Sequence, residues 1–140
     1  MTAARSLAFL VAVFLAIIPA NAGEAKKALI ARWYTALQSV DRVDIATLLS
    51  DKAIITLDDM EIQQTKSEFL VSLDEWEDAM KGSTIRHAIE SDDAEIITVT
   101  VCYQFPDNES LTREIFTFEA AKIIGSAQST IADNCEALPK

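Results

Sequence analysis

Two ionisable side chains stand within alternating apolar segments, in positions suited to a general acid or base. His87 lies between Ile85 and Ile89, and Glu114 comes two residues before Phe116. Because the side chains of a strand alternate between its faces, both should point toward the core side of a sheet. Burial there raises the pKa of a glutamate and lowers the pKa of a histidine, which tunes both for proton transfer. His87 and Glu114 are therefore candidate catalytic residues.

Both residues also have a purely structural interpretation. Glu114 can pair with Arg86 or Arg113 at the rim of a sheet, and His87 can be a hydrogen-bonded residue of a pocket wall. The carboxylates between positions 74 and 78 are expected to form the solvated face of a helix around a buried Trp76.

The hydrophobic periodicity indicates the elements that would position these side chains. Helices are expected at 25–40, in a short segment capped by Asp44, and after a capping box of Thr65 and Glu68, with Gly82 ending the third. Strands are expected at 53–57, 60–64, around 85–89, and at 97–105, 112–120 and 123–131, the last bulged at Gly125. This order predicts an α+β domain with helices packed on one face of a curved sheet.

The segment RWYTALQSVDRVDIATLLSDKAIITLDD resembles the opening of the nuclear transport factor 2-like superfamily, which includes ketosteroid isomerases and SnoaL-like polyketide cyclases. The resemblance follows the element order over nearly all of residues 23–140. It implies a cone-shaped domain of three N-terminal helices on a curved, mainly antiparallel sheet. It also implies a ligand pocket enclosed by the concave face of that sheet and the helices.

The resemblance also suggests roles for individual residues. The proton-transferring Asp of ketosteroid isomerases falls at Asp58, and the late-strand acid of their oxyanion hole falls at Glu114. Their helix-one Tyr falls at Trp33 or Tyr34, with Trp33 the closer match by count, so that the phenol hydroxyl would be missing. Alternatively, Trp33 is plain core and Asp58 is a hairpin-turn acid. The expected pocket walls are Trp33, Tyr34, Val99, Val101, Tyr103, Phe116 and Phe118.

Residues 1–22 read as a cleaved secretory signal peptide. Arg5 supplies the positive region, residues 7–18 the apolar region, and Ala20-Asn21-Ala22 the cleavage site. The apolar stretch is shorter than the roughly 20 residues that span a bilayer, which argues against a retained anchor. We therefore expect a secreted or periplasmic domain of residues 23–140. In that compartment Cys102 and Cys135 are expected to form a disulfide, with two buried free thiols as the alternative.

Charge narrows the range of partners. The formal net charge of −10 becomes −11 without Arg5, which argues against nucleic acid and anionic membranes as partners. One histidine and no CxxC spacing argue against a zinc site, and no cofactor is expected. An apolar small molecule, a homodimer or a basic protein partner fits this composition. The sequon at Asn108 matters only if the source is eukaryotic.

Three functions follow from these observations. The first is an exported small-molecule-binding or interaction domain with a cone-shaped pocket. The second is a cofactor-independent isomerase, dehydratase or cyclase of the SnoaL-like type, which would use Asp58, His87 and Glu114. The third is an acidic periplasmic protein–protein module, which the negative charge would steer to a basic partner.

Overall fold

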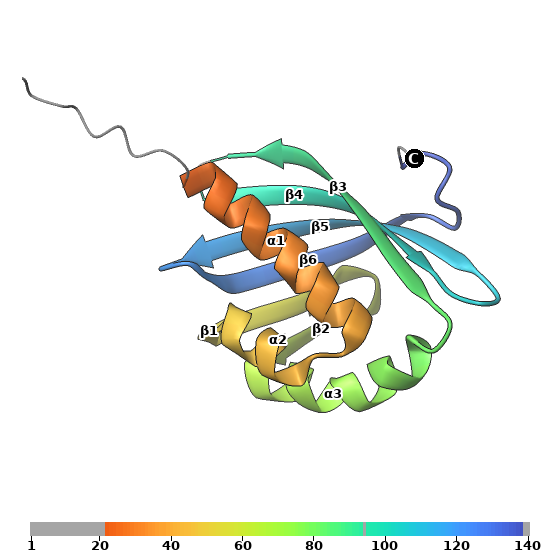
Figure 1. Cartoon of the computed structure of the whole chain (residues 1–140), viewed down its shortest axis with the longest axis horizontal. Helices are drawn as coiled ribbons and strands as arrows, with labels where there is room; N and C mark the ends of the chain where they lie inside the picture. The colour runs from red at the N-terminus through yellow and green to blue at the C-terminus, as the bar shows by residue number, and fades with distance from the viewer. Residues whose placement is uncertain (1–21, 94, 139–140) are drawn as a thin grey trace, which may run out of the picture.

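The computed structural model describes residues 22–93 and 95–138. Within them the chain forms three α-helices, one 3₁₀ helix and six strands (Figure 1). Their bounds are α1 Ala22–Ser39, α2 Arg42–Leu48, β1 Leu49–Leu57, the 3₁₀ helix Asp58–Met60, β2 Ile62–Thr65, α3 Lys66–Ala79, β3 Thr84–Asp92, β4 Ile96–Gln104, β5 Glu109–Glu119 and β6 Lys122–Ala132. The predicted signal peptide lies outside the described residues except for Ala22. No helix in the described part of the chain is long and apolar enough to cross a membrane.

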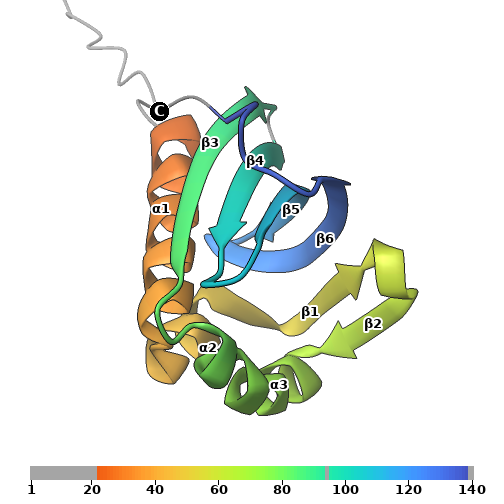
Figure 2. The same ribbon diagram turned by 90° about the vertical axis from the view of Figure 1, so that its right-hand side faces the viewer.

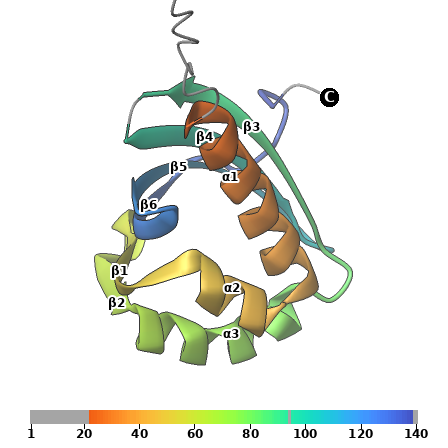
Figure 3. The same cartoon turned by 60° about the vertical axis from the view of Figure 1, so that its left-hand side comes forward.

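The strands form one six-stranded sheet in the order β2-β1-β6-β5-β4-β3. Neighbouring strands are antiparallel except β1 and β6, which are parallel. The sheet curves strongly, as Figure 2 shows. In Figure 3, α1 runs beside β3, α2 lies next to β1, and α3 lies below β1 and β2. The α+β architecture with three helices on a curved, mainly antiparallel sheet is therefore confirmed.

Local signals explain where the helices begin and end. The predicted capping box is present, since Thr65 and Glu68 satisfy each other's backbone amides at the start of α3. Gly82 follows α3 with a φ of 74°, a conformation that glycine adopts without a Cβ clash. The cap of α2 is Asp41, because its side chain accepts a hydrogen bond of 3.0 Å from the amide of Asp44. The prediction that Asp44 caps this helix is wrong: Asp44 lies in the first turn and its carboxylate binds Arg32.

The alternation expected on the sheet is confirmed on its central strands. Val99, Val101 and Tyr103 of β4 are buried together in the main core with the helices. The pairing of β5 with β6 shifts register between Thr117 and Phe118, which places a bulge next to Gly125. A Cβ at Gly125 would lie 2.5 Å from Oγ1 of Thr117. The bulge predicted there is present, and a larger residue at position 125 would force the Thr117 side chain to move.

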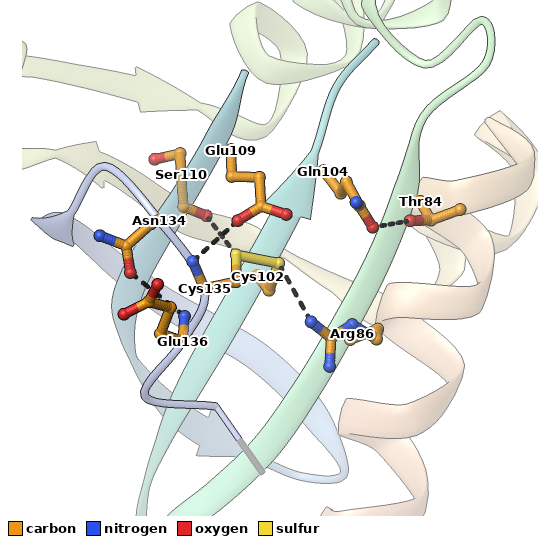
Figure 4. Close-up of a disulfide and its surroundings, with 9 residues drawn as sticks. All are labelled: Thr84, Arg86, Cys102, Gln104, Glu109, Ser110, Asn134, Cys135 and Glu136. Atoms are coloured by element: carbon orange, nitrogen blue, oxygen red, sulfur yellow. Dashed lines mark hydrogen bonds between the residues drawn. A yellow bond between two sulfur atoms is a disulfide. The ribbon is translucent and has the colours of Figure 1, made fainter. Parts of the chain in front are cut away.

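A second, small core lies on the opposite face of the sheet and contains the disulfide (Figure 4). Cys102 of β4 is bonded to Cys135, which follows β6, with their Cα atoms 5.6 Å apart. Leu111 and Leu138 complete the cluster. The amide of Cys135 donates a hydrogen bond of 3.0 Å to Glu109. The disulfide is thus present, and it fastens the segment after β6 to the outer face.

Candidate functional site

Glu114 is the buried carboxylate around which the candidate site is built. It lies in the middle of β5 with its side chain inward, and the residue is 2% exposed. The hydroxyl of Tyr34 donates a hydrogen bond of 2.8 Å to Oε2, and that of Tyr103 donates one of 2.5 Å to Oε1. Thr112 donates a longer one of 3.4 Å to Oε1. Both carboxylate oxygens therefore have the partners that a buried carboxylate requires.

Helix and strand periodicity bring the side chains of Tyr34, Tyr103 and Glu114 together. Tyr34 lies on the buried face of α1 with Ile30 and Leu37, at the spacing of one helical face. Tyr103 comes from β4, and β4 pairs with β5 so that Val99 faces Glu114 across the strands. Because Val99 and Tyr103 are separated by an even number of residues, they share the inward face. The tyrosines therefore approach the carboxylate from a helix and from a neighbouring strand.

The surroundings of Glu114 favour protonated groups. Burial raises the pKa of Glu114, while hydrogen bonds from Tyr103, Tyr34 and Thr112 partly oppose that rise. Burial and then the nearby charge of Glu114 raise the pKa of both tyrosines well above 10.0. The phenols therefore remain donors at physiological pH, and Glu114 holds its proton to a higher pH than an exposed glutamate. Such a group can give or accept a proton under mild conditions.

A cavity of about 490 Å³ opens above Glu114 between the sheet, α1 and α3. Its lining is mostly apolar and aromatic. The lining residues are Trp33, Leu37, Ile55, Leu57, Met60, Ile62, Gln64, Phe69, Ser72, Glu75, Trp76, Ala79, Tyr103, Phe105, Ser110, Glu114, Ser126 and Gln128. We call the part formed by Glu114 and Tyr103 the cavity floor. Among the described residues, no group of three or more His, Cys, Asp or Glu side chains could hold a metal ion.

Tyr34, not Trp33, supplies the helix-one hydroxyl. Both residues are buried, but the ring of Trp33 packs against Phe69 at 5.7 Å and lines the cavity. The indole N–H of Trp33 is buried without a hydrogen-bond partner among the described residues, so ring packing holds it. The prediction that the hydroxyl is missing is therefore wrong. Adjacent helical residues point about 100° apart, which makes a count along the sequence insufficient to choose between them.

Five expected wall residues lie deeper than the cavity. Tyr34, Val99, Val101, Phe116 and Phe118 are buried in the main core and are not among the lining residues, although Tyr34 binds Glu114. Phe116 packs edge-on against the ring of Tyr34 at 6.1 Å. These residues support the site from behind.

Asp58 and His87 do not join Glu114 in the cavity. Asp58 is exposed in the 3₁₀ helix after β1 and is not a lining residue. His87 is half-buried and stacks on Tyr34, with ring centroids 4.6 Å apart and planes 27° from parallel. Burial lowers the pKa of His87. The three expected acid–base residues are thus not all in one cavity, and His87 contacts the site by stacking on Tyr34.

Neither arginine that was considered as a partner binds Glu114. Arg113 lies on the outer face, where its Nε is 3.1 Å from a carboxylate oxygen of Glu90. Arg86 donates a long hydrogen bond of 3.8 Å to Sγ of Cys102, which also lies on that face (Figure 4). The rim ion pair is therefore excluded, and the strand register that points Glu114 inward is correct.

Several cavity residues carry weak signals in the sequence. Ser126 and Gln128 of β6 are two residues apart, and Gln128 lies opposite Glu114 in the β5–β6 pairing. Polar residues at that spacing give no apolar alternation by which to assign a face. Glu75 of α3 lines the cavity although it lies in the acidic run next to Trp76. Glu75 is exposed, as expected for this run, and it also borders the cavity.

No family model and no curated protein matches the sequence. The structure resembles a protein from Kribbella flavida provisionally named a ketosteroid isomerase, with 14% identity and a TM-score of 0.66 over 84% of this chain and 85% of that one. A nuclear transport factor 2-like protein of unknown function from Burkholderia xenovorans is 16% identical, with a TM-score of 0.67 over 81% of this chain and 88% of that one. The epoxide hydrolase/cyclase-like enzyme SalBIII is 13% identical, with a TM-score of 0.67 over 76% and 91%. The chain therefore has the nuclear transport factor 2-like fold that the resemblance implied.

Proposed function

We propose that this chain binds a mainly apolar small molecule in the cavity, with one polar group of that molecule at the floor. The observation that supports this function is a cavity of about 490 Å³ whose walls are largely aromatic and aliphatic and whose floor contains a buried carboxyl. Ligand pockets in proteins typically have this size and this mixture of many apolar groups and a few convergent polar ones.

The polar groups near the floor indicate how such a molecule would be oriented. Gln128 lies across from Glu114 on β6, and Ser126 lines the same space. Together with Tyr103 they offer both donors and acceptors of hydrogen bonds. A hydroxyl, carbonyl or amino group of the ligand would be held there while its apolar body contacts Trp76 and the other rings.

Filling the cavity tests the proposal. Ala79 lines it from the exposed end of α3, so Ala79→Trp should occupy the space without disturbing the core. Protein purified from expressing cells would be extracted with organic solvent, and the extract analysed by mass spectrometry. A co-purifying small molecule should be retained by the wild type and by the control Ala31→Trp, which adds the same ring at an exposed site on α1. Equal retention by Ala79→Trp would contradict binding in this cavity.

A second candidate function is acid–base catalysis without a cofactor, as in an isomerase, dehydratase or cyclase. The observation that favours it is Glu114 itself, because burial raises its pKa and two phenols position its carboxyl. In its protonated form Glu114 would give a proton to a substrate oxygen, and the resulting carboxylate would take a proton back. The likeness to an epoxide hydrolase/cyclase-like enzyme agrees with this chemistry at the level of the fold.

Proton exchange separates catalysis from binding alone. A bicyclic ketone dissolved in D₂O with the protein should exchange its α-protons faster than in buffer, as followed by NMR. Glu114→Gln should remove the acceleration, while Glu119→Gln on the exposed end of the same strand should retain it. A ketone that binds but exchanges at the buffer rate would leave the binding function and exclude this catalysis.

A further inference from the structure

The cavity lining contains acidic side chains but no basic ones. Glu75 and Glu114 are carboxylates, and no Lys, Arg or His is among the lining residues. Glu114 lies at the floor, whereas Glu75 is exposed on α3. A bound anion would therefore meet negative charge without a compensating cation, and a bound cation would meet the opposite charge.

Glu75 differs from the other acids of its helix. Asp74 and Glu77 both pair with Arg42 at 2.9 Å, and Asp78 pairs with Lys81 at 2.6 Å. Among the described residues Glu75 has no ion-pair partner. Its carboxylate is therefore the one in this run whose charge is not already matched by a neighbouring side chain.

A groove that also contains Glu75 likewise has no basic side chain in its lining. It has a volume of about 480 Å³ and shares Gln64, Ser72 and Glu75 with the cavity. Its remaining lining residues are Ser67, Glu68 and Val71, again without a basic side chain. Because Glu75 is exposed and lines both spaces, it lies at the mouth of the cavity.

The walls behind this mouth are aromatic. The ring of Trp76 stands edge-on to Tyr103 at 5.7 Å and to Phe105 at 6.4 Å, and the latter two rings are nearly parallel. Trp33 and Phe69 stack on each other at 5.7 Å and line the same space. The faces of such rings attract cations, and groups of rings next to a carboxylate recognise ammonium groups in proteins.

We propose that the cavity selects an apolar organic cation, an amine or a quaternary ammonium compound, and that Glu75 is the residue that determines this selectivity. This proposal rests on the proposed binding function and adds the chemical class of the ligand. The ammonium group lies at the mouth between Glu75 and the ring of Trp76, and the apolar body extends toward the floor. An anion of the same shape is repelled by the carboxylate of Glu75 and meets no basic side chain in the lining.

A series of three compounds with one apolar body provides the test. The probes are 2-naphthylmethylamine, 2-naphthalenemethanol and 2-naphthoic acid, titrated into the full-length protein by calorimetry at neutral pH and physiological salt. The amine should bind about tenfold more tightly than the alcohol, and the acid should bind most weakly. Glu75→Gln should remove most of the preference for the amine while leaving the dissociation constant of the alcohol unchanged.

Glu77→Gln is the matched control, because it makes the same change in charge two residues further along α3 at a residue that pairs with Arg42. It should keep the preference for the amine. If the alcohol binds the wild type as tightly as the amine does, the selectivity is refuted while the binding function stands. If Glu77→Gln loses as much as Glu75→Gln, attraction to the whole acidic surface explains the preference and Glu75 is not its determinant. Failure of all three compounds to bind would contradict the binding function as well.

Discussion

Tyr34 and Glu114 are 80 residues apart in the sequence, yet the hydroxyl of Tyr34 donates a hydrogen bond of 2.8 Å to the carboxylate of Glu114. The bond joins α1 to the centre of the sheet. Tyr103 reaches the other carboxylate oxygen from β4. A helix and two strands thus meet at one buried acid.

Glu114→Gln should change how stability depends on pH. Burial raises the pKa of Glu114 above its ordinary 4.5, so the folded protein retains a proton that the unfolded chain releases. The stability from this group is complete below about pH 4.5 and is lost as the pH rises through the folded-state pKa. The free energy of unfolding of the wild type, relative to the variant, should therefore fall with rising pH in urea titrations. A relative stability that rises instead would contradict the raised pKa.

Tyr34→Phe should destabilise the protein through Glu114. Leaving a buried polar group without its hydrogen-bond partner lowers the free energy of unfolding by about 1–3 kcal/mol. The same substitution should lower the free energy of unfolding by less in a Glu114→Gln background, because the carboxyl group to which the phenol donates its hydrogen bond is absent there. Denaturant unfolding of the two single variants and the double variant gives this coupling. Equal costs in both backgrounds would mean that the bond contributes no coupling energy.

His87→Phe should also change the pH dependence of stability, but with the opposite sign and at acidic pH. Burial lowers the pKa of His87 below 6.5, so the unfolded chain binds a proton that the folded protein resists. The stability from the neutral imidazole is present above about pH 6.5 and is lost as the pH falls through the folded-state pKa. Phenylalanine keeps a ring against Tyr34 and does not titrate. The wild type should therefore lose stability relative to His87→Phe on acidification, as followed by thermal unfolding.

Cys135→Ser should lower stability by removing the cross-link to Cys102. The two cysteines are 33 residues apart, and closing a loop of this length stabilises a fold by about 3–4 kcal/mol in the chain-entropy model. The wild type treated with reductant should match the variant in urea unfolding. Denatured, unreduced wild type should show no free thiol, and two titrating thiols would exclude the bridge.

The purified, exported protein should begin at Gly23. Ala20 and Ala22 are the small residues that a signal peptidase site requires, and a Cys102–Cys135 bond agrees with an oxidising compartment. N-terminal sequencing of protein recovered from the envelope or medium gives the answer. Intact Met1 on protein extracted from membranes would contradict cleavage.

The sheet could be predicted because its central strands face two different environments. On β4, alternation of Val99, Val101 and Tyr103 with Thr100 and Cys102 defines both faces. The same period carried over to Glu114 places it inward without any knowledge of its partners. Residues within a strand of clear apolar alternation, including a polar one such as Glu114, are thus the ones that sequence patterns can locate.

The candidate site was harder to predict. Its contacts depend on which way each helix turns its side chains and on segments that are far apart in the sequence. Trp33 and Tyr34 are both buried, so burial does not reveal which one reaches the acid. Asp58 follows β1, but the chain turns there into a 3₁₀ helix that leaves its side chain exposed. Glu75 belongs to an acidic run typical of a solvated face, and only the position of α3 over the cavity distinguishes it.

The parallel pairing of β1 with β6 has a consequence for how the chain folds. It joins Leu49 to Ile123 and Leu57 to Gln128, so the hairpin of β1 and β2 attaches to the rest of the sheet only through the last strand. Contacts between residues so far apart raise the relative contact order, and such topologies fold slowly. The antiparallel strands from β3 to β6 can pair in sequence, but the cavity closes only when β1 docks against β6. We therefore expect the cavity to form late in folding, after the antiparallel strands have paired.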